Sequence, residues 1–219
     1  MVEFDISDLH FYIINLKEDE QKRRFMEDQM IRFNFKFEFI EGIKITPRPI
    51  GIALSHLKVL KQKGLKAPFV VLEDDCEFFE KLVELKIKLP SNCDALYLGH
   101  STFGVREKDQ YGLQWGKENA AQYSIYDDNY IRIHSMLSRH AIIYISEKFH
   151  QNTIEANLRA LTNFAFPYPG DMAYQQIQND HLILAPKNPW CYQSEKFRGN
   201  HPATKVSIME KIKPIEHNG

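Results

Sequence analysis

Short apolar runs alternate with amphipathic segments over the first part of the chain. The segment "HFYIINL", residues 10–16, is almost continuously apolar, which is typical of a strand covered on both faces. In the charged segment that follows, Met26, Met30 and Phe33 recur at helical spacing and predict a helix with one buried face. The segment "FKFEFIEG", residues 35–42, alternates apolar and charged side chains, as in a strand with one face in water. The chain therefore begins with a β-α-β pattern.

The same alternation continues to residue 100. Apolar side chains from Ile50 to Leu57 return to helical spacing and predict a second helix. We then expect a strand at residues 69–72, a helical piece at 79–89 and another strand at 94–99. Strands that alternate with helices predict an α/β protein with a mainly parallel central sheet flanked by helices. Ligands of such sheets bind at the carboxyl ends of the strands.

The second half of the sequence is less regular. Residues 101–130 are polar and weakly periodic, and we treat them as a long excursion that could include a hairpin or a mobile lid. Beyond it, the pattern predicts a strand in "RHAIIYIS" (139–146), a helix at 147–162, a short helix in "GDMAYQQIQ" (170–178) and a last strand in "HLILAP" (181–186). The sequence contains no internal repeat.

Composition narrows the class of protein. The chain has 219 residues, of which 43% are hydrophobic and 26% charged, and this favours one globular domain. A formal charge of -1 and a pI near 6.8 argue against a nucleic-acid or anionic-membrane partner. The first apolar run is too short for a signal peptide or a transmembrane segment, so we expect a cytoplasmic location. Cys76, Cys93 and Cys191 lack metal-ligand spacing and are expected to be reduced, structural thiols.

Three adjacent carboxylates follow the predicted strand at residues 69–72. Two such charges about 4 Å apart repel by roughly 1 kcal/mol in water and roughly 4 kcal/mol at an effective dielectric of 20. If the strand continues, Glu73 and Asp75 point to one side and Asp74 to the other. Carboxylates at the end of a strand suit Mg²⁺ or Mn²⁺, which complete their coordination with water and substrate phosphates. The alternative is a polar loop in which Asp74 or Asp75 caps a following helix.

Several blocks of sequence, taken in order, resemble glycosyltransferase family 25, the lipooligosaccharide and collagen-type galactosyltransferase family. These blocks are "FYIINLKEDEQKRRFMEDQM", "FKFEFIEGI", "GIALSHLKVLKQ" and "FVVLEDDCEF". "DALYLG" and "HAIIYIS" look like later blocks of the same family. The likeness covers residues 10–100 well and 138–185 loosely. The chain departs from the family at Ser138, Arg139, Glu147 and Lys148, all on the expected acceptor side.

The resemblance implies a GT-A-type nucleotide-sugar-binding fold and inverting transfer of a hexose, commonly galactose from UDP-galactose, to a hydroxyl of a glycan or glycoconjugate acceptor. It implies that Glu73, Asp74 and Asp75 form the family's DXD-like motif, with Glu73 and Asp75 on Mn²⁺ or Mg²⁺. The ion would neutralise charge that develops on the UDP leaving group. Residues 1–219 would form a single domain, with the nucleotide-sugar half in 1–100 and the acceptor-side half and C-terminal tail in 101–219.

Further candidates for the donor side come from the first strand and the two helices that follow. From the residues alone, these positions also fit a strand-to-helix turn, a solvated helix face and a packed helical histidine. The family pattern places them near the donor, with one of the two arginines on phosphate. The candidates are Asn15, Leu16, Arg23, Arg24, Ser55 and His56.

On the acceptor side, an inverting transferase needs a general base, because the attacking hydroxyl must lose its proton. Asp171 follows the rigid turn "PYPG" and is our candidate, with capping of a helix as its alternative role. Asp127 and Asp128 are reserve candidates for the base. Weaker candidates for metal, phosphate or sugar contacts are His100, Trp115, Tyr168, His181, Trp190, Tyr192, Arg198 and His201.

Two other functions fit the carboxylate cluster. A Mg²⁺-dependent phosphoryl hydrolase, including a nuclease, could use the same cluster without any sugar acceptor. A nonenzymatic nucleotide-sugar-binding module could bind UDP without turnover, and its binding would not depend on Asp171. The sequence does not indicate an oligomeric state.

Overall fold

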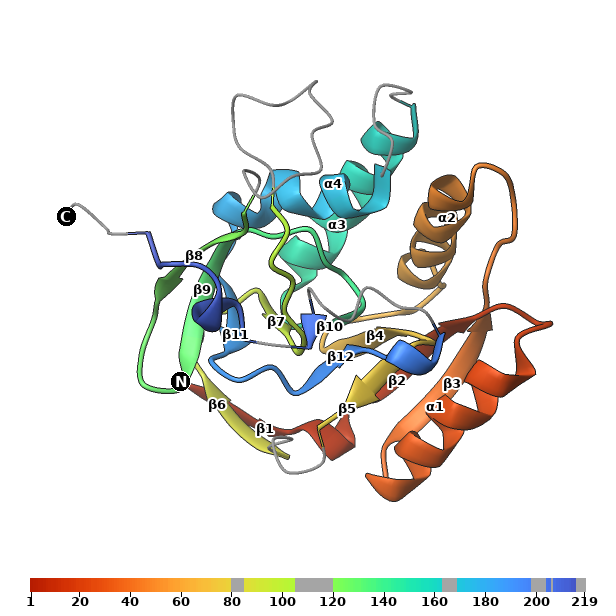
Figure 1. Ribbon diagram of the computed structural model, residues 1–219, viewed down its shortest axis with the longest axis horizontal. Coiled ribbons are helices and arrows are strands. Elements are labelled where there is room, and N and C mark those ends of the chain that lie inside the picture. The colour runs from red at the N-terminus through yellow and green to blue at the C-terminus, as the bar shows by residue number, and fades with distance from the viewer. Residues whose placement is uncertain (80–84, 105–119, 163–168, 198–203, 206, 216–219) are drawn as a thin grey trace.

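The computed structural model describes residues 1–79, 85–104, 120–162, 169–197, 204–205 and 207–215 (Figure 1). The α-helices in these residues are α1 (Glu20–Arg32), α2 (Arg48–Leu60), α3 (Glu147–Thr162) and α4 (Pro169–Ile177). The strands are β1 (Val2–Asp5), β2 (His10–Asn15), β3 (Lys36–Glu41), β4 (Phe69–Glu73), β5 (Cys76–Phe78), β6 (Lys86–Leu89), β7 (Ala95–Tyr97), β8 (Gln122–Ile125), β9 (Tyr130–Ser135), β10 (Ala141–Tyr144), β11 (Ile183–Pro186) and β12 (Cys191–Gln193).

A central sheet of eight strands organises the molecule, in the order β3-β2-β4-β10-β7-β11-β9-β8. Strands β3, β2 and β4 are parallel neighbours, and β7 and β11 form another parallel pair. Strands β9 and β10 run against the rest. The expected α/β class with a mainly parallel sheet flanked by helices is confirmed, with these reversed strands as an addition that the sequence pattern did not indicate.

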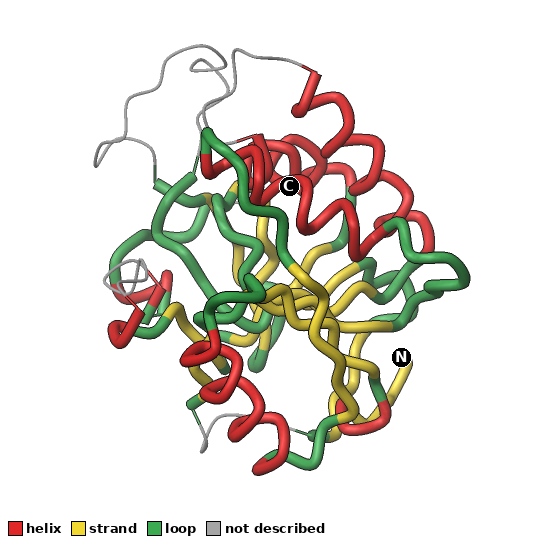
Figure 2. Tube along the Cα trace, turned by 90° about the vertical axis from the view of Figure 1, so that its right-hand side faces the viewer, coloured by secondary structure: helices red, strands yellow, loops and turns green. Residues whose placement is uncertain are grey.

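Helices cover both faces of this sheet. Helices α2, α3 and α4 lie on one face, whereas α1 and the small β1–β6 and β5–β12 sheets lie on the other (Figure 1). Figure 2, turned by 90°, shows the strands between these helical layers. Alternate residues of β4 divide between the layers, since Val71 joins the core under α2, α3 and α4, and Val70 and Leu72 join the core beside α1. This double burial explains the continuous apolar runs of the central strands.

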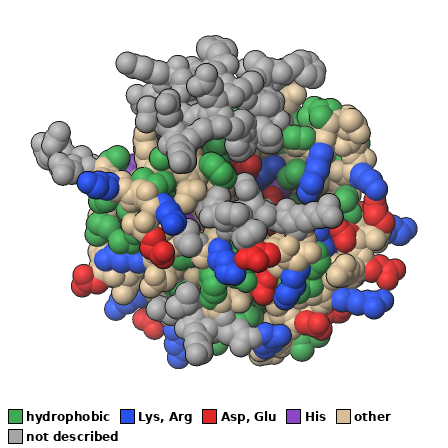
Figure 3. All heavy atoms as spheres, viewed as in Figure 1, with side chains coloured by type: hydrophobic (Ala, Val, Ile, Leu, Met, Phe, Trp, Pro, Cys, Tyr) green, Lys and Arg blue, Asp and Glu red, His purple; other side chains and the backbone are tan. Residues whose placement is uncertain are grey.

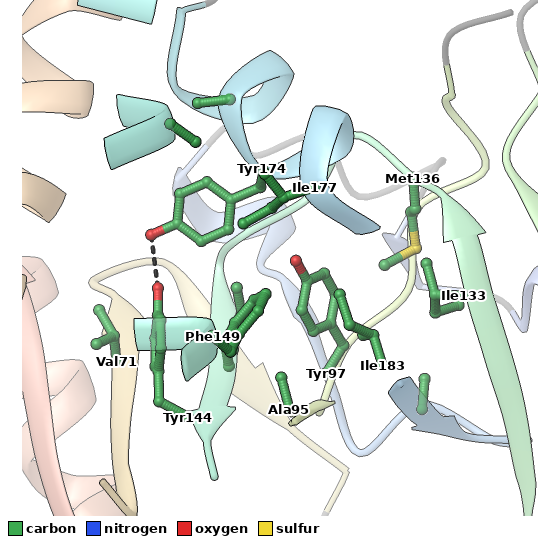
Figure 4. Packing of buried hydrophobic residues seen from close by; sticks show 14 of the residues in the cluster. Val71, Ala95, Tyr97, Ile133, Met136, Tyr144, Phe149, Tyr174, Ile177 and Ile183 are labelled. Atoms are coloured by element: carbon green, nitrogen blue, oxygen red, sulfur yellow. Dashed lines mark hydrogen bonds between the residues drawn. The ribbon is translucent and has the colours of Figure 1, made fainter. Parts of the chain in front are cut away.

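Large aromatic side chains fill the core beneath α3 and α4. Tyr97, Tyr144, Phe149 and Tyr174 are all almost fully buried. The hydroxyls of Tyr144 and Tyr174 are 2.6 Å apart and share a hydrogen bond between the sheet and α4 (Figure 4). The hydrogen bond satisfies both buried hydroxyls and ties α4 to the sheet.

The structure corrects the expectation of a helix over residues 79–89. Residues 80–84 lie outside the described residues, and Lys86–Leu89 is strand β6, paired antiparallel with β1. Its lysines are exposed, whereas Ile87 and Leu89 are buried, so the local pattern has the period of a strand. Pairing with β1 outweighs the helical preference of the residues that precede β6 in the sequence.

The predicted excursion at residues 101–130 is described only in part, since residues 105–119 lie outside the described residues. Strand β8 begins within it and forms an antiparallel hairpin with β9, which follows it. Expectations for Trp115, Tyr168, Arg198 and His201 also fall outside the described residues. No helix in the described part of the chain is long and apolar enough to cross a membrane.

Candidate functional site

The three carboxylates lie where β4 ends. Glu73 is the last residue of β4, and Asp74 and Asp75 form the turn that leads into β5. The strand therefore does not continue through the cluster, and the segment that follows is a strand rather than a helix that an aspartate could cap. We call residues 73–75 the acidic turn.

Distant parts of the chain hold the acidic turn in place. The side-chain amide of Gln29 on α1 donates to the carbonyl oxygen of Cys76 at 2.9 Å and accepts from the backbone N–H of Phe78 at 2.8 Å. The backbone N–H of Ser194 donates to the carbonyl oxygen of Asp75 at 2.7 Å. These hydrogen bonds fix the backbone on which the three carboxylates are presented.

Glu73 has two basic neighbours. The Nε2 atom of His56 lies 3.0 Å from its Oε1, and Nε of Arg139 lies 3.9 Å from the same oxygen. Burial, followed by the charge of Arg139, lowers the pKa of His56 to about 4, so the imidazole is neutral and donates its N–H to Glu73. Burial opposes ionisation of Glu73, but the hydrogen bond from His56 and the charge of Arg139 outweigh it and lower the pKa of Glu73. Glu73 is therefore an ionised, paired carboxylate.

Asp74 points toward α1 and is also paired. Its Oδ1 accepts a hydrogen bond from Nζ of Lys22 at 2.8 Å, and its Oδ2 accepts one from Nδ2 of Asn15 at 2.9 Å. Burial raises the pKa of Asp74, although Lys22 and Asn15 oppose the rise. Asn15 thus lies beside the acidic turn, as a donor-side candidate should.

Arg23 and Arg24 do not reach the acidic turn. Arg24 is exposed and pairs with Glu20 at 3.3 Å, whereas the guanidinium of Arg23 lies 4.0 Å from the ring centre of Phe39. Both arginines line a different open hollow, between α1 and the ends of β2 and β3. The basic residue of α1 that does reach the acidic turn is Lys22, through Asp74. Its spacing of four residues before Met26 places it on the inward face of the helix, and this spacing could have revealed it.

Asp75 differs from its neighbours because one of its oxygens is buried and unpaired. The residue is 8% exposed, and its Oδ1 atom has no hydrogen-bond partner in the described part of the chain. Burial, together with the charge of Glu73, raises the pKa of Asp75 to about 6. The acidic turn therefore holds a buried carboxylate oxygen without a hydrogen-bond partner among the described residues, at high electrostatic cost.

Two cavities meet at the acidic turn. The larger, of about 730 Å³, is lined by the β3–α2 segment and by Leu16, Lys22, His56 and all three carboxylates. The smaller, of about 290 Å³, extends toward α4 and is lined by Arg139, His140 and Asp171 among others. Arg48, Ile52, Glu73 and Asp75 line both cavities. The face shown in Figure 3 carries acidic and basic side chains side by side, without an extended surface of one charge.

Ser55 supports the wall of the larger cavity from within α2. Its hydroxyl donates to the carbonyl oxygen of Gly51 at 2.7 Å and accepts from the backbone N–H of Ile43 at 2.7 Å. It therefore anchors the β3–α2 segment, whereas the neighbouring His56 reaches the carboxylates directly.

Asp171 lies in the first turn of α4 and faces the smaller cavity. Its Oδ1 atom is 3.3 Å from Nε of Arg139, a side chain that is only 4% exposed. Burial raises the pKa of Asp171, although the charge of Arg139 opposes the rise. The structure thus brings Asp171 and Glu73, which are distant in sequence, to the same Nε atom of one buried arginine.

The remaining described candidates lie in local structural contacts. His100 is fully buried and accepts a hydrogen bond from the backbone N–H of Ile208 at 3.2 Å. Asp127 accepts from the backbone N–H of Tyr130 at 2.8 Å within the β8–β9 turn. His181 lies 3.1 Å from the carboxylate of Asp94. None of the described candidates in this group lines either cavity at the acidic turn: Asp127, Asp128, His100, His181, Trp190 and Tyr192.

The carboxylate oxygens of the acidic turn determine which kind of metal ion it could hold. Among the described residues, no group of three or more His, Cys, Asp or Glu side chains could hold an ion. The Oδ1 atom of Asp75 is buried without a hydrogen-bond partner among the described residues, and Glu73 lies beside Asp75 on both cavity walls. This set fits an ion that takes one or two protein ligands and completes its shell with water and phosphate, as Mg²⁺ does. It does not fit an ion held entirely by the protein.

Comparison with known proteins adds little to this picture. No family model matches the chain, and no curated protein matches it. Among solved structures, the chain is similar to a glycosyltransferase involved in the glycosylation of the major capsid of PBCV-1, with 9% sequence identity and a TM-score of 0.41. The match covers 81% of this chain and 93% of that chain. A likeness this low does not establish a shared fold or function. The resemblance to glycosyltransferase family 25 therefore rests on the sequence motifs alone.

Proposed function

We propose that this protein is a metal-dependent, inverting glycosyltransferase that moves a hexose, galactose by the family resemblance, from a UDP-sugar to a hydroxyl of a glycan or glycoconjugate. The observation that carries this proposal is the position of the acidic turn on the shared wall of two cavities, where Asp75 has an oxygen without a hydrogen-bond partner among the described residues. A transferase needs such a junction, because the donor and the acceptor must meet at one anomeric carbon.

The larger cavity suits the donor nucleotide. Its volume of about 730 Å³ lies within the range of small-molecule and cofactor sites. Arg48 lies at the junction of the cavities, is exposed, and forms no ion pair with the described residues, so its guanidinium is available to a diphosphate. Lys22, by contrast, is committed to Asp74. We therefore assign the phosphate contact to Arg48 in place of Arg23 or Arg24.

A divalent ion held by Asp75, with Glu73 beside it, would supply neutralising charge for the departing diphosphate. On the other side of the junction, Asp171 accepts the proton of the acceptor hydroxyl. Its raised pKa makes its carboxylate a better base than an exposed aspartate. Arg139 stabilises the ionised form of Asp171, and its charge also lies beside Glu73.

Calorimetric titration of UDP in Mn²⁺, repeated in EDTA, tests the donor half of this proposal. We expect binding only with the metal, and a panel of UDP-sugars in the same assay then identifies the preferred sugar. The Asp75→Ala variant should lose the metal-dependent binding, whereas the matched Asp28→Ala variant on the exposed surface of α1 should keep it. Equal affinity in Mn²⁺ and EDTA would refute the metal assignment.

The same preparation separates the alternative functions. Absence of UDP binding under both conditions, together with metal-dependent cleavage of a phosphate ester such as p-nitrophenyl phosphate, would replace the transferase by a phosphoryl hydrolase. Metal-dependent UDP binding, with no UDP released from any UDP-sugar in the presence of mixed glycan acceptors by either the unaltered protein or Asp171→Asn, would indicate a binding module.

A further inference from the structure

Arg139 is the most deeply buried arginine at the two cavities, and it lies at one of the positions where the chain departs from the family pattern. Its Nε atom is 3.3 Å from Asp171 and 3.9 Å from Glu73. Its Nε and Nη1 atoms have no hydrogen-bond partner among the described residues. The side chain is only 4% exposed, so its unused N–H donors are costly unless a ligand accepts hydrogen bonds from them.

The backbone of α4 provides a seat for this guanidinium. A Cβ atom added at Gly170 would lie 1.9 Å from the guanidinium carbon and both terminal nitrogens of Arg139. The other side of the seat includes the ring of Tyr174, whose centre is 5.8 Å from the guanidinium carbon. Only glycine at position 170 therefore permits the observed position of Arg139, directly beside Asp171.

The smaller cavity in front of Arg139 has the size and the lining of a site for one sugar ring. Its volume of about 290 Å³ is at the lower end for ligand sites, roughly 300 to 1,000 Å³, and is well below that of the neighbouring cavity. Apart from its charged groups, the polar part of its wall is made of hydroxyl and amide side chains: Ser101, Ser138, Gln193 and Thr204. Phe103 and Leu137 add apolar surface that can cover a ring face.

The charges on the wall indicate that the ring is neutral. The positive charge of Arg139 is already balanced by Glu73 and Asp171. His140, the other buried basic group on the wall, faces Glu73, Asp75 and the Cys191 thiol. The exposed Arg48 also lines this cavity, and the proposed function assigns its guanidinium to the diphosphate of the donor. A carboxylate on the ligand would add an uncompensated negative charge, whereas hydroxyl groups can accept from Arg139 and donate to Asp171 without changing the charge.

We propose that the cavity of about 290 Å³ is the acceptor subsite, that it takes one uncharged sugar ring, and that Arg139, seated on Gly170, is the positioning residue that orients this ring toward Asp171. The inference rests on the proposed function, because it assigns the second substrate of the same reaction. It extends that function by naming the chemical class of the acceptor unit and the residue that selects it.

Ligand-observed NMR titration of the full chain tests this assignment with methyl β-D-galactopyranoside, methyl β-D-glucopyranoside and methyl β-D-glucuronide. Each glycoside is titrated with and without Mg²⁺-UDP, because Mn²⁺ would broaden the NMR signals. We expect at least one of the neutral glycosides to bind, and to bind more tightly than the glucuronide. Gly170→Ala and Arg139→Lys should each weaken neutral glycoside binding by about tenfold or more, because the forked N–H donors are lost or displaced.

The controls separate the acceptor subsite from folding and from the donor site. Both variants should still bind UDP by calorimetry, which a misfolded protein would not do, and Arg159→Gln on the exposed side of α3 should bind the glycoside like the unaltered protein. Tighter binding of the glucuronide, unchanged glycoside affinity in both variants, or UDP binding without any binding of a neutral glycoside would overturn the inference. Glycoside binding that depends on Arg139 in a protein that does not bind UDP would leave the subsite standing and refute the transferase.

Discussion

Replacing Asp75 by asparagine should stabilise the protein while it removes metal binding. Burial and the neighbouring Glu73 raise the pKa of Asp75 from 3.8 to about 6. One pKa unit is equivalent to about 1.4 kcal/mol, so the ionised side chain costs the folded state about 3 kcal/mol relative to the unfolded chain. Asparagine has nearly the same shape and no charge. We therefore expect Asp75→Asn to increase the free energy of unfolding by up to about 3 kcal/mol at neutral pH.

The sign of this effect fixes its pH dependence. Because the folded state has the higher pKa, it keeps the proton of Asp75 over a range in which the unfolded chain has lost it, and stability falls as the pH rises from about 4 to about 6. Above this window the full cost is present, and below it the cost disappears. The gain from Asp75→Asn should thus be roughly half as large at pH 5 as at pH 8.

Urea unfolding of the metal-free protein at pH 5 and pH 8 measures this difference. The Asp28→Asn variant changes an exposed aspartate on α1 and should leave the free energy of unfolding within about 0.5 kcal/mol at both pH values. Addition of Mn²⁺ and UDP should stabilise the unaltered protein and not Asp75→Asn. A variant that is less stable than the unaltered protein at pH 8, or equally affected at both pH values, would contradict the description of Asp75 as a buried, uncompensated carboxylate.

Three further substitutions test other parts of the structure. Gln29→Leu removes both side-chain hydrogen bonds to β5, and should lower the free energy of unfolding by about 2 kcal/mol in urea and weaken UDP binding in calorimetry, because the acidic turn loses its support. Tyr144→Phe takes away the hydrogen-bond partner of the Tyr174 hydroxyl and should cost about 1 to 2 kcal/mol in the same unfolding assay. Asp171→Asn should retain UDP binding but reduce sugar transfer by about 100-fold or more, measured as UDP release in the presence of acceptor.

Much of the fold could be predicted because its elements have strong local periodicity. The helix expected at residues 147–162 coincides with α3, and the central strands β2, β4, β7, β10 and β11 were all expected from their apolar runs. The reversed direction of β9 and β10 could not be predicted, because periodicity is the same for a strand that runs either way. Strand β6 was wrongly expected as helix, because its four alternating residues gain their strand structure only by pairing with β1.

For the site, the sequence indicated the candidate carboxylates but not the side chains that they contact. The acidic turn was visible as three adjacent carboxylates, and Asp171 was visible after its rigid turn. Arg139 was noted only as a departure from the family pattern. Its proximity to both depends on the packing of α4 against the sheet and on the missing side chain of Gly170. Contacts of this kind join residues that no local pattern links, so a single sequence does not reveal them.

The unequal pairing of the three carboxylates is the strongest argument that the acidic turn binds a cation. A protein that used this cluster only for structure would lower its cost by pairing every member. Here Glu73 has a hydrogen bond from His56 and the charge of Arg139 nearby, and Asp74 accepts hydrogen bonds from Lys22 and Asn15. Asp75, between the same elements, keeps a buried oxygen without a partner in the described residues and a raised pKa. A divalent ion with a phosphate ligand would remove this remaining cost, and binding of the ion would then stabilise the folded protein.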